Sequence, residues 1–182
     1  RTFRVGLATP NAANAPLIIS QTFSDTCAVF MQPDMTGRNG QPCGQVNVPG
    51  IATSIFGPYI ATAPVDQYLD AGYAYASFYA SEIVPDRSST ASAAMQQMDG
   101  GAAIPTSAIT AWAYGYSAII DVLETDLKID ADRIAVLGHS RHGKAALVAG
   151  AYDPRIAAVL AHQSGYGVQP HRAQLWAKGS TR

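Results

Sequence analysis

The segment GHSRHGK at residues 138–144 combines side chains that could carry out ester chemistry. Ser140 offers a hydroxyl nucleophile, and Arg141 and Lys144 bring positive charge close to it. A serine attacks well when a histidine accepts its proton, and cations or backbone N–H groups stabilise the resulting oxyanion. These residue types favour a serine hydrolase. On the residues alone, two alternatives stay open: a serine that only caps a helix, and two cations that only face solvent.

Two other kinds of site fit this segment poorly. The spacing G-x-x-x-x-G-K matches a phosphate-binding loop, but Ala145 stands where that loop needs a hydroxyl to bind magnesium. His139 and His142 lie three residues apart, with no carboxylate or third ligand beside them to complete a metal site. We therefore expect no metal and no cofactor.

The elements around Ser140 are typical of a parallel α/β fold. The apolar run Ile134–Gly138 predicts a buried strand, and the Ala-rich run after Ser140 predicts a helix to about Tyr152. Upstream, apolar residues at the helical period predict a helix that Ser107 caps and that extends to about Leu123. The serine is thus expected on a sharp turn between a strand and a helix.

The rest of the chain repeats this alternation. Further strands are predicted at Phe3–Ala8, from Leu17, at Tyr73–Tyr79 and from Arg155, with a short helix ending near Gly72. We interpret residues 24–50 as a long surface excursion, residues 88–105 as a loop and Asp130–Arg133 as a turn. Alternating strands and helices predict a mostly parallel sheet with helices on both faces, whose site forms at the carboxyl ends of the strands.

A serine on such a turn is the nucleophile elbow of α/β-hydrolases. GHSRHGKAAL resembles the G-x-S-R-x-G-K motif of the glucuronoyl esterases, α/β-hydrolases that cleave esters between xylan-borne glucuronate and lignin alcohols. The segments AWAYGYSAIIDVLETDLKIDADRIAVLGHSR, YLDAGYAYASFYASEIVPD and PLIISQTF are also similar to that family, so the resemblance covers most of residues 1–165. The chain departs from the commoner G-x-S-x-G pattern, because His142 precedes the glycine at 143.

The resemblance implies a three-layer α/β-hydrolase sandwich over residues 1–182, incomplete at its C-terminus, with the elbow at 138–144. Ser140 would be the nucleophile, Arg141 would stabilise the oxyanion, and Lys144 would reach hydroxyls of the glucuronate ring. Gln163 follows a strand where fungal members carry a glutamate. It either binds substrate by a hydrogen bond or only caps the strand.

The implied function is a serine carboxylesterase acting on glucuronate esters that link xylan to lignin. One alternative is an esterase of acetylxylan or other small esters. Another is a catalytically incomplete fragment that binds carbohydrate through an aromatic surface, with Tyr59, Tyr73, Tyr75 and Trp112 as candidates.

The resemblance also implies the chain order serine, acid, histidine. Of the four histidines, only His171 lies in a tail free enough to fold back, and a solvent-exposed role suits it better. We expect the catalytic acid and base to come after Arg182, so that the sequence is part of a longer enzyme.

The composition of the chain limits the kinds of binding partner that we expect. With 14% charged residues and a net charge of −1, the chain gives no reason to expect nucleic acid or an anionic membrane as a partner. We expect a monomer that binds a polysaccharide or small-molecule ester. Cys27 and Cys43 are either free thiols or a disulfide closing a loop of about 15 residues, worth about 3 kcal/mol. These cysteines and the scarcity of lysine favour a secreted or periplasmic protein.

Overall fold

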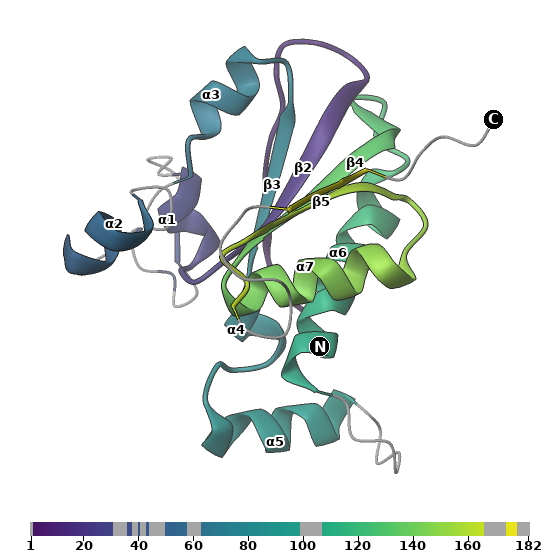
Figure 1. The fold of residues 1–182 in the computed structure, drawn as a ribbon. Coiled ribbons are helices and arrows are strands. Elements are labelled where there is room, and N and C mark those ends of the chain that lie inside the picture. Colours follow the sequence, from purple (N-terminus) through teal and green to yellow (C-terminus); the bar gives the residue numbers. More distant parts are fainter. Residues whose placement is uncertain are drawn as a thin grey trace.

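A mixed, mostly parallel sheet forms the centre of the molecule. The computed structural model describes residues 2–30, 36–37, 40, 43, 50–57, 63–98, 107–165 and 174–177. Its six strands have the order β1-β3-β2-β4-β5-β6 (Figure 1). Their bounds are β1 Val5–Ala8, β2 Ala15–Thr22, β3 Ala74–Tyr79, β4 Ile129–His139, β5 Ile156–His162 and β6 Gln174–Ala177. The inner pairs are parallel, and β1 and β6 join antiparallel to β3 and β5. The predicted parallel sheet is confirmed.

Helices lie against both faces of this sheet (Figure 1). Their bounds are α1 Thr26–Phe30, α2 Gly50–Phe56, α3 Val65–Asp70, α4 Ala80–Ile83, α5 Ser88–Met98, α6 Ala108–Leu123 and α7 Arg141–Tyr152. Within the described part of the chain, no helix combines the length and apolar character needed to cross a bilayer.

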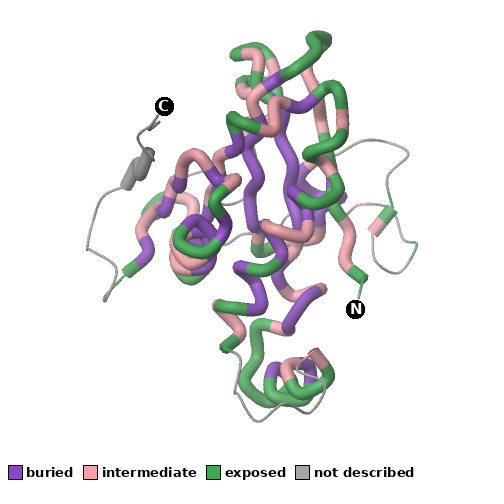
Figure 2. The backbone as a smooth tube through the Cα atoms, turned by 90° about the vertical axis from the view of Figure 1, so that its right-hand side faces the viewer, coloured by how far each residue is buried: buried purple, intermediate pink, exposed green. Residues whose placement is uncertain are grey.

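The alternation of side chains along the strands divides the core in two. On β2, Leu17 and Ile19 join the larger apolar cluster, to which α6 and α7 contribute, whereas Ile18 points to the opposite face. There it meets Tyr75 of β3, with α1 and α3 packed alongside. Figure 2 shows the strand backbones at the centre of the molecule as buried. The larger cluster fixes α6 and α7 against the sheet, and α7 directly follows the candidate nucleophile.

Several predicted elements are confirmed in detail. Ser107 caps α6 and accepts a hydrogen bond of 3.1 Å from the backbone N–H of Thr110. α6 ends at Leu123 and α7 at Tyr152, as the apolar periodicity predicts.

Three expectations about local structure are wrong. The segment expected to be a loop from residue 88 forms α5 over Ser88–Met98. Thr26–Phe30, inside the expected surface excursion, is the helix α1 with four buried residues. Asp130–Arg133 is no separate turn but an irregular part of β4, where the pairing with β2 shifts register. In α1 and α5, burial against neighbouring elements overrides the weak local signal of small and polar residues. In β4, where Asp132 and Arg133 are exposed, the strand continues through an irregularity in its pairing with β2.

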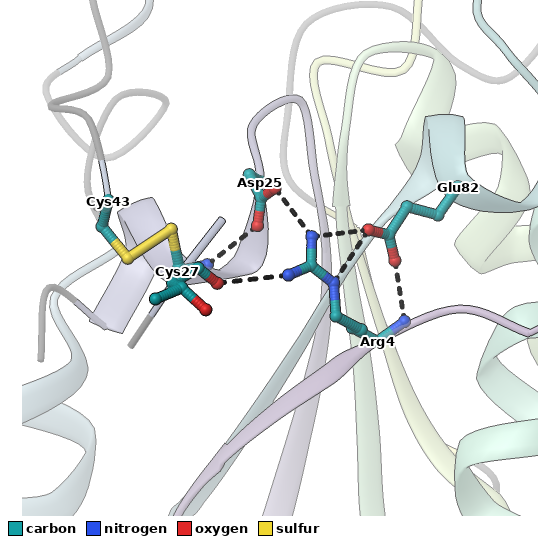
Figure 3. The surroundings of a disulfide bond; sticks show 6 residues. Arg4, Asp25, Cys27, Cys43 and Glu82 are labelled. Carbon is teal, nitrogen blue, oxygen red and sulfur yellow. Dashed lines mark hydrogen bonds and ion pairs between the residues drawn. A yellow bond between two sulfur atoms is a disulfide. The ribbon is translucent and has the colours of Figure 1, made fainter. Parts of the chain in front are cut away.

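The two cysteines form a disulfide. Cys27 of α1 bonds to Cys43 across a Cα–Cα distance of 5.6 Å, which decides between the two states that the sequence left open. Beside it, Arg4 forms ion pairs with Asp25 at 2.9 Å and with Glu82 at 3.0 Å (Figure 3). These contacts link the start of the chain to α1 and to α4.

Candidate active site

The strand order reverses direction between β2 and β4. The chain passes from β2 outward to β3, but from β4 outward to β5 on the other side. Such a reversal opens a crevice at the carboxyl ends of the two central strands, where ligands of α/β proteins bind. Phe23 follows β2 and Ser140 follows β4, so both lie at this crevice.

The backbone of Ser140 has an unusual conformation. Its φ of 55° and ψ of −123° lie in a region that side-chain-bearing residues rarely adopt, at a cost of about 1–3 kcal/mol. Its N–H donates a hydrogen bond of 2.9 Å to the carbonyl of His162, which ties the turn to the end of β5. The hydroxyl makes no capping hydrogen bond to α7. Ser140 therefore does not serve as the side-chain cap that the residues alone left open.

Two glycines allow this sharp turn. A Cβ on Gly138 would collide with the carbonyl of His142 and stand 2.7 Å from the backbone nitrogen of Gly143. A Cβ on Gly143 would stand 2.6 Å from the hydroxyl of Ser164, which follows β5. The glycine at 143 thus brings α7 close to β5, while position 142 is free to carry a large side chain.

His142 fills the space beneath the turn. Its ring stacks on Phe23 with centroids 4.0 Å apart and meets the edge of Trp112 at 5.4 Å. The residue is 1% exposed, and this burial, with the nearby charge of Arg141, lowers its pKa to about 3. The imidazole is neutral at ordinary pH and acts as part of the core.

Two predicted cations lie on the first turn of α7. The guanidinium of Arg141 is half-exposed, places Nη1 2.6 Å from both carboxylate oxygens of Asp86, and lies 5.9 Å from the Phe23 ring. Lys144 closes this first turn. It is half-buried, and its backbone N–H donates a hydrogen bond of 3.3 Å to the Ser140 carbonyl. The backbone N–H groups that precede it point from the helix N-terminus, where they can stabilise a developing anion.

Gln163 and two histidines complete the edge of the crevice on the β5 side. Gln163 has a φ of 48°, and its side-chain carbonyl oxygen is buried with no hydrogen-bond partner among the described residues. His139 and His162 are neighbours in the sheet, with Nδ1 atoms 3.1 Å apart. Burial lowers the pKa of each, and in His139 the neighbouring imidazole adds to the effect.

Phe23 lines two cavities at this edge. One, of about 260 Å³, is lined by residues such as Tyr68, His139 and His162. The other, of about 310 Å³, is lined by residues that include Asp86 and His142.

The predicted aromatic carbohydrate surface is wrong for two of its members. Tyr75 is fully buried and Trp112 is 2% exposed, because both pack in the core. Tyr73 is 40% exposed. Tyr59 lies outside the described residues, as does His171.

Sequence reasoning missed Asp86, and it places only the loop after Phe23 at the site, not the Phe23 ring itself. Both follow predicted strands: Phe23 ends PLIISQTF, and Asp86 comes soon after the strand that ends at Tyr79. A search for the residues just beyond the carboxyl ends of the parallel strands includes Phe23, whereas Asp86 lies beyond α4 and would have escaped it.

Known proteins resemble the chain in sequence. The sequence pattern of the family described as fungal glucuronyl esterase matches residues 35–181. The 4-O-methyl-glucuronoyl methylesterase of Podospora anserina is 38% identical over 133 residues, 71% of this chain and 26% of that protein. A 4-O-methyl-glucuronoyl methylesterase of Phanerochaete chrysosporium is 52% identical over 69 residues, which are 37% of this chain and 15% of that protein. The chain thus spans about a quarter or less of these relatives.

Solved structures agree with the fold. The glucuronoyl esterase of Solibacter usitatus matches 90% of this chain with a TM-score of 0.72 and 29% identity, over 43% of its own length. That of Teredinibacter turnerae matches 90% of this chain with a TM-score of 0.65 and 29% identity, over 37% of its length. These likenesses confirm the α/β-hydrolase type of sheet.

Proposed function

The chain belongs to the glucuronyl esterase family, and on that premise we propose that it acts as a serine carboxylesterase on glucuronate esters that link xylan to lignin. One observation carries the proposal: the strained backbone of Ser140 at the reversal point of the sheet, with φ 55°. Strain of this kind persists where the surrounding structure enforces it, and it is concentrated at functional sites.

Ser140 attacks the carbonyl carbon of the ester, and a base accepts the hydroxyl proton. The C–O bond to the alcohol then breaks, the alcohol leaves with a proton, and water hydrolyses the acyl-enzyme to release the uronic acid. N–H groups of the first turn of α7 and the charge of Arg141 stabilise the oxyanion. We assign the base to none of the three described histidines: His142 packs in the core, and His139 and His162 contact one another.

The remaining site residues bind the sugar. Lys144, half-buried one turn after Ser140, donates hydrogen bonds to ring hydroxyls. Gln163 hydrogen-bonds the substrate. Its side-chain oxygen is buried without a hydrogen-bond partner in the part of the chain that the structure describes, which supports this role over that of a simple strand cap. Lys144 and Gln163 approach the Ser140 turn from α7 and from the end of β5, which supports a substrate rich in hydroxyl groups.

We extend the proposal to the whole molecule. Residues 1–182 belong to one α/β-hydrolase domain that acts as a monomer on a polysaccharide ester. The Cys27–Cys43 disulfide supports a secreted or periplasmic location, because disulfides persist in oxidising compartments.

Labelling with a fluorophosphonate tests the nucleophile. With the segment that supplies the catalytic base present, we expect intact-mass spectrometry to detect one covalent adduct, and none on Ser140→Ala. Methyl glucuronate hydrolysis, followed as methanol release, should be lost in the same variant.

An adduct that persists in Ser140→Ala would contradict the assigned nucleophile. Turnover of acetylated xylan without turnover of glucuronate esters would favour the alternative esterase. A folded chain without adduct or turnover would favour the binding fragment.

A further inference from the structure

The guanidinium of Arg141 is positioned by an ion pair with Asp86 as well as by its place on the elbow. Its Nη1 atom lies 2.6 Å from each carboxylate oxygen of Asp86, which comes from the segment between α4 and α5. The guanidinium carbon also lies 5.9 Å from the centre of the Phe23 ring. Asp86 thus occupies one nitrogen of the cation next to the nucleophile and places a negative charge beside the site.

The segments that carry Asp86 and Arg141 both contact the buried side chain of Trp112. The indole N–H of Trp112 donates a hydrogen bond of 2.9 Å to the carbonyl of Val84, two residues before Asp86. The same indole packs against His142, the neighbour of Arg141. Exposed ion pairs contribute little when two flexible side chains must be ordered to form them. Here the backbone on both sides of the pair is fixed by the core.

The charge of the acyl group changes during the proposed reaction. The uronate ester is neutral at the group that Ser140 attacks, whereas the released uronic acid is an anion at neutral pH. A cation beside that group stabilises the oxyanion, but it also attracts the product carboxylate. The fixed carboxylate of Asp86 repels the product anion and competes with it for Nη1 of Arg141, while a neutral ester meets no such repulsion.

We propose that Asp86 is a specificity-determining residue that, through Arg141, lowers the affinity of the site for the uronate anion relative to the neutral ester, and so promotes product release. The proposal rests on the proposed function, because it takes uronate esters as substrates.

Binding to a chain that cannot turn over separates the two ligands. In a Ser140→Ala background, methyl glucuronate and glucuronate are titrated separately at pH 7 and low salt, and chemical shifts are followed by NMR. We expect Asp86→Asn to tighten glucuronate binding on the order of tenfold and to change methyl glucuronate binding less than twofold. Asp86→Glu, which keeps the charge, should keep the preference for the ester. Added salt should narrow the difference in glucuronate affinity that Asp86→Asn produces, because salt screens the repulsion between the two carboxylates.

A control removes a carboxylate from another arginine far from Ser140, Arg155, which also pairs with Glu124 and Asp153. Asp121 of α6 pairs with Arg155 at 2.7 Å, near the start of β5 and thus at the opposite edge of the sheet. Asp121→Asn removes the same charge and should leave the affinity for both ligands unchanged. The readout is the ratio of the two affinities, which a general loss of stability would not shift.

The outcomes separate the two proposals. Equal shifts for both ligands in Asp86→Asn, or no shift although both ligands bind, would overturn the role of Asp86 and leave the proposed function standing. Failure of both ligands to bind any variant would overturn the uronate substrate class, and the role of Asp86 with it.

Discussion

Ser140 keeps its strained backbone because the residues around it leave no relaxed alternative. Gly138 lies under the first turn of α7, and the Ser140 N–H is bound to the end of β5 at 2.9 Å. Both contacts hold the turn from the two sides of the serine. The type and place of Ser140 could be predicted from the sequence, since a glycine-flanked serine follows an apolar run. The partner of Arg141 could not, because Asp86 is 55 residues away in the chain.

Replacing Gly138 should destabilise the chain without touching the hydroxyl. In Gly138→Ala the new methyl group meets backbone atoms of α7, which cannot move as a side chain can, so we expect a loss of about 1–3 kcal/mol. Urea denaturation measures this loss. Gly50→Ala is the control, because among the described residues no atom outside its chain neighbours and its own helix backbone lies within 4 Å of the added Cβ. Equal midpoints for the two variants would contradict the close packing at the elbow.

His142 should make the fold sensitive to acid. Its pKa is about 3 in the folded chain and 6.5 ordinarily, so between these values only the unfolded chain binds the proton. The free energy of unfolding therefore falls as pH drops below 6.5. Between pH 7 and pH 4 this residue accounts for a loss of about 3 kcal/mol. In His142→Leu we expect the pH dependence of urea denaturation to be weaker by this amount. An unchanged pH dependence would show that the buried imidazole is not responsible.

Among the elements, α6 and α7 were predictable and α5 was not. α6 has a Ser107 cap and a clear apolar stripe, two signals that lie within one helix. α5 buries only Ala91 and Ala94, and its sequence is otherwise rich in serine, threonine and glutamine. Alanine is a weak mark of a core position because it is common on surfaces as well. Ala91 and Ala94 pack against the rest of the larger apolar cluster and so form the buried face of α5. The sequence does not show this contact.

A charge on that face should displace α5. Ala94→Asp would bury a carboxylate without a partner, and we expect a loss of about 2–3 kcal/mol. Ala93→Asp introduces the same side chain one position earlier, where the helix is exposed, and should cost less than about 1 kcal/mol. Urea denaturation of both variants provides the comparison. Equal losses would mean that α5 does not pack through Ala94.

For the whole molecule, the alternation of strands and helices was sufficient to predict the sheet and the edge at which the site lies. The antiparallel addition of β1 and the pairing of the cysteines depend on contacts between distant segments. Arg4, which directly precedes β1, pairs with Asp25 and Glu82, and the disulfide lies beside them (Figure 3). No local pattern in the sequence encodes such a meeting.

The disulfide should stabilise the chain as a whole. It closes a separation of 16 residues, for which the loss of chain entropy in the unfolded state predicts about 3 kcal/mol. We expect a reductant to lower the urea midpoint of the unaltered chain. The double variant Cys27→Ala, Cys43→Ala should begin at the lower midpoint and show no response to reductant. A midpoint that reductant leaves unchanged in the unaltered chain would contradict this contribution.

The geometry of the elbow predicts which of its residues would be replaced in descendants that lose activity. Gly138 and Gly143 are required by packing, so a descendant that had lost all activity would still keep them in order to fold. Ser140 is different: its φ of 55° suits glycine better than serine. Once selection for chemistry ends, replacement of Ser140 by glycine relieves strain and stabilises the fold. In a lineage of such chains, the serine rather than its glycine neighbours would record whether catalysis is still under selection.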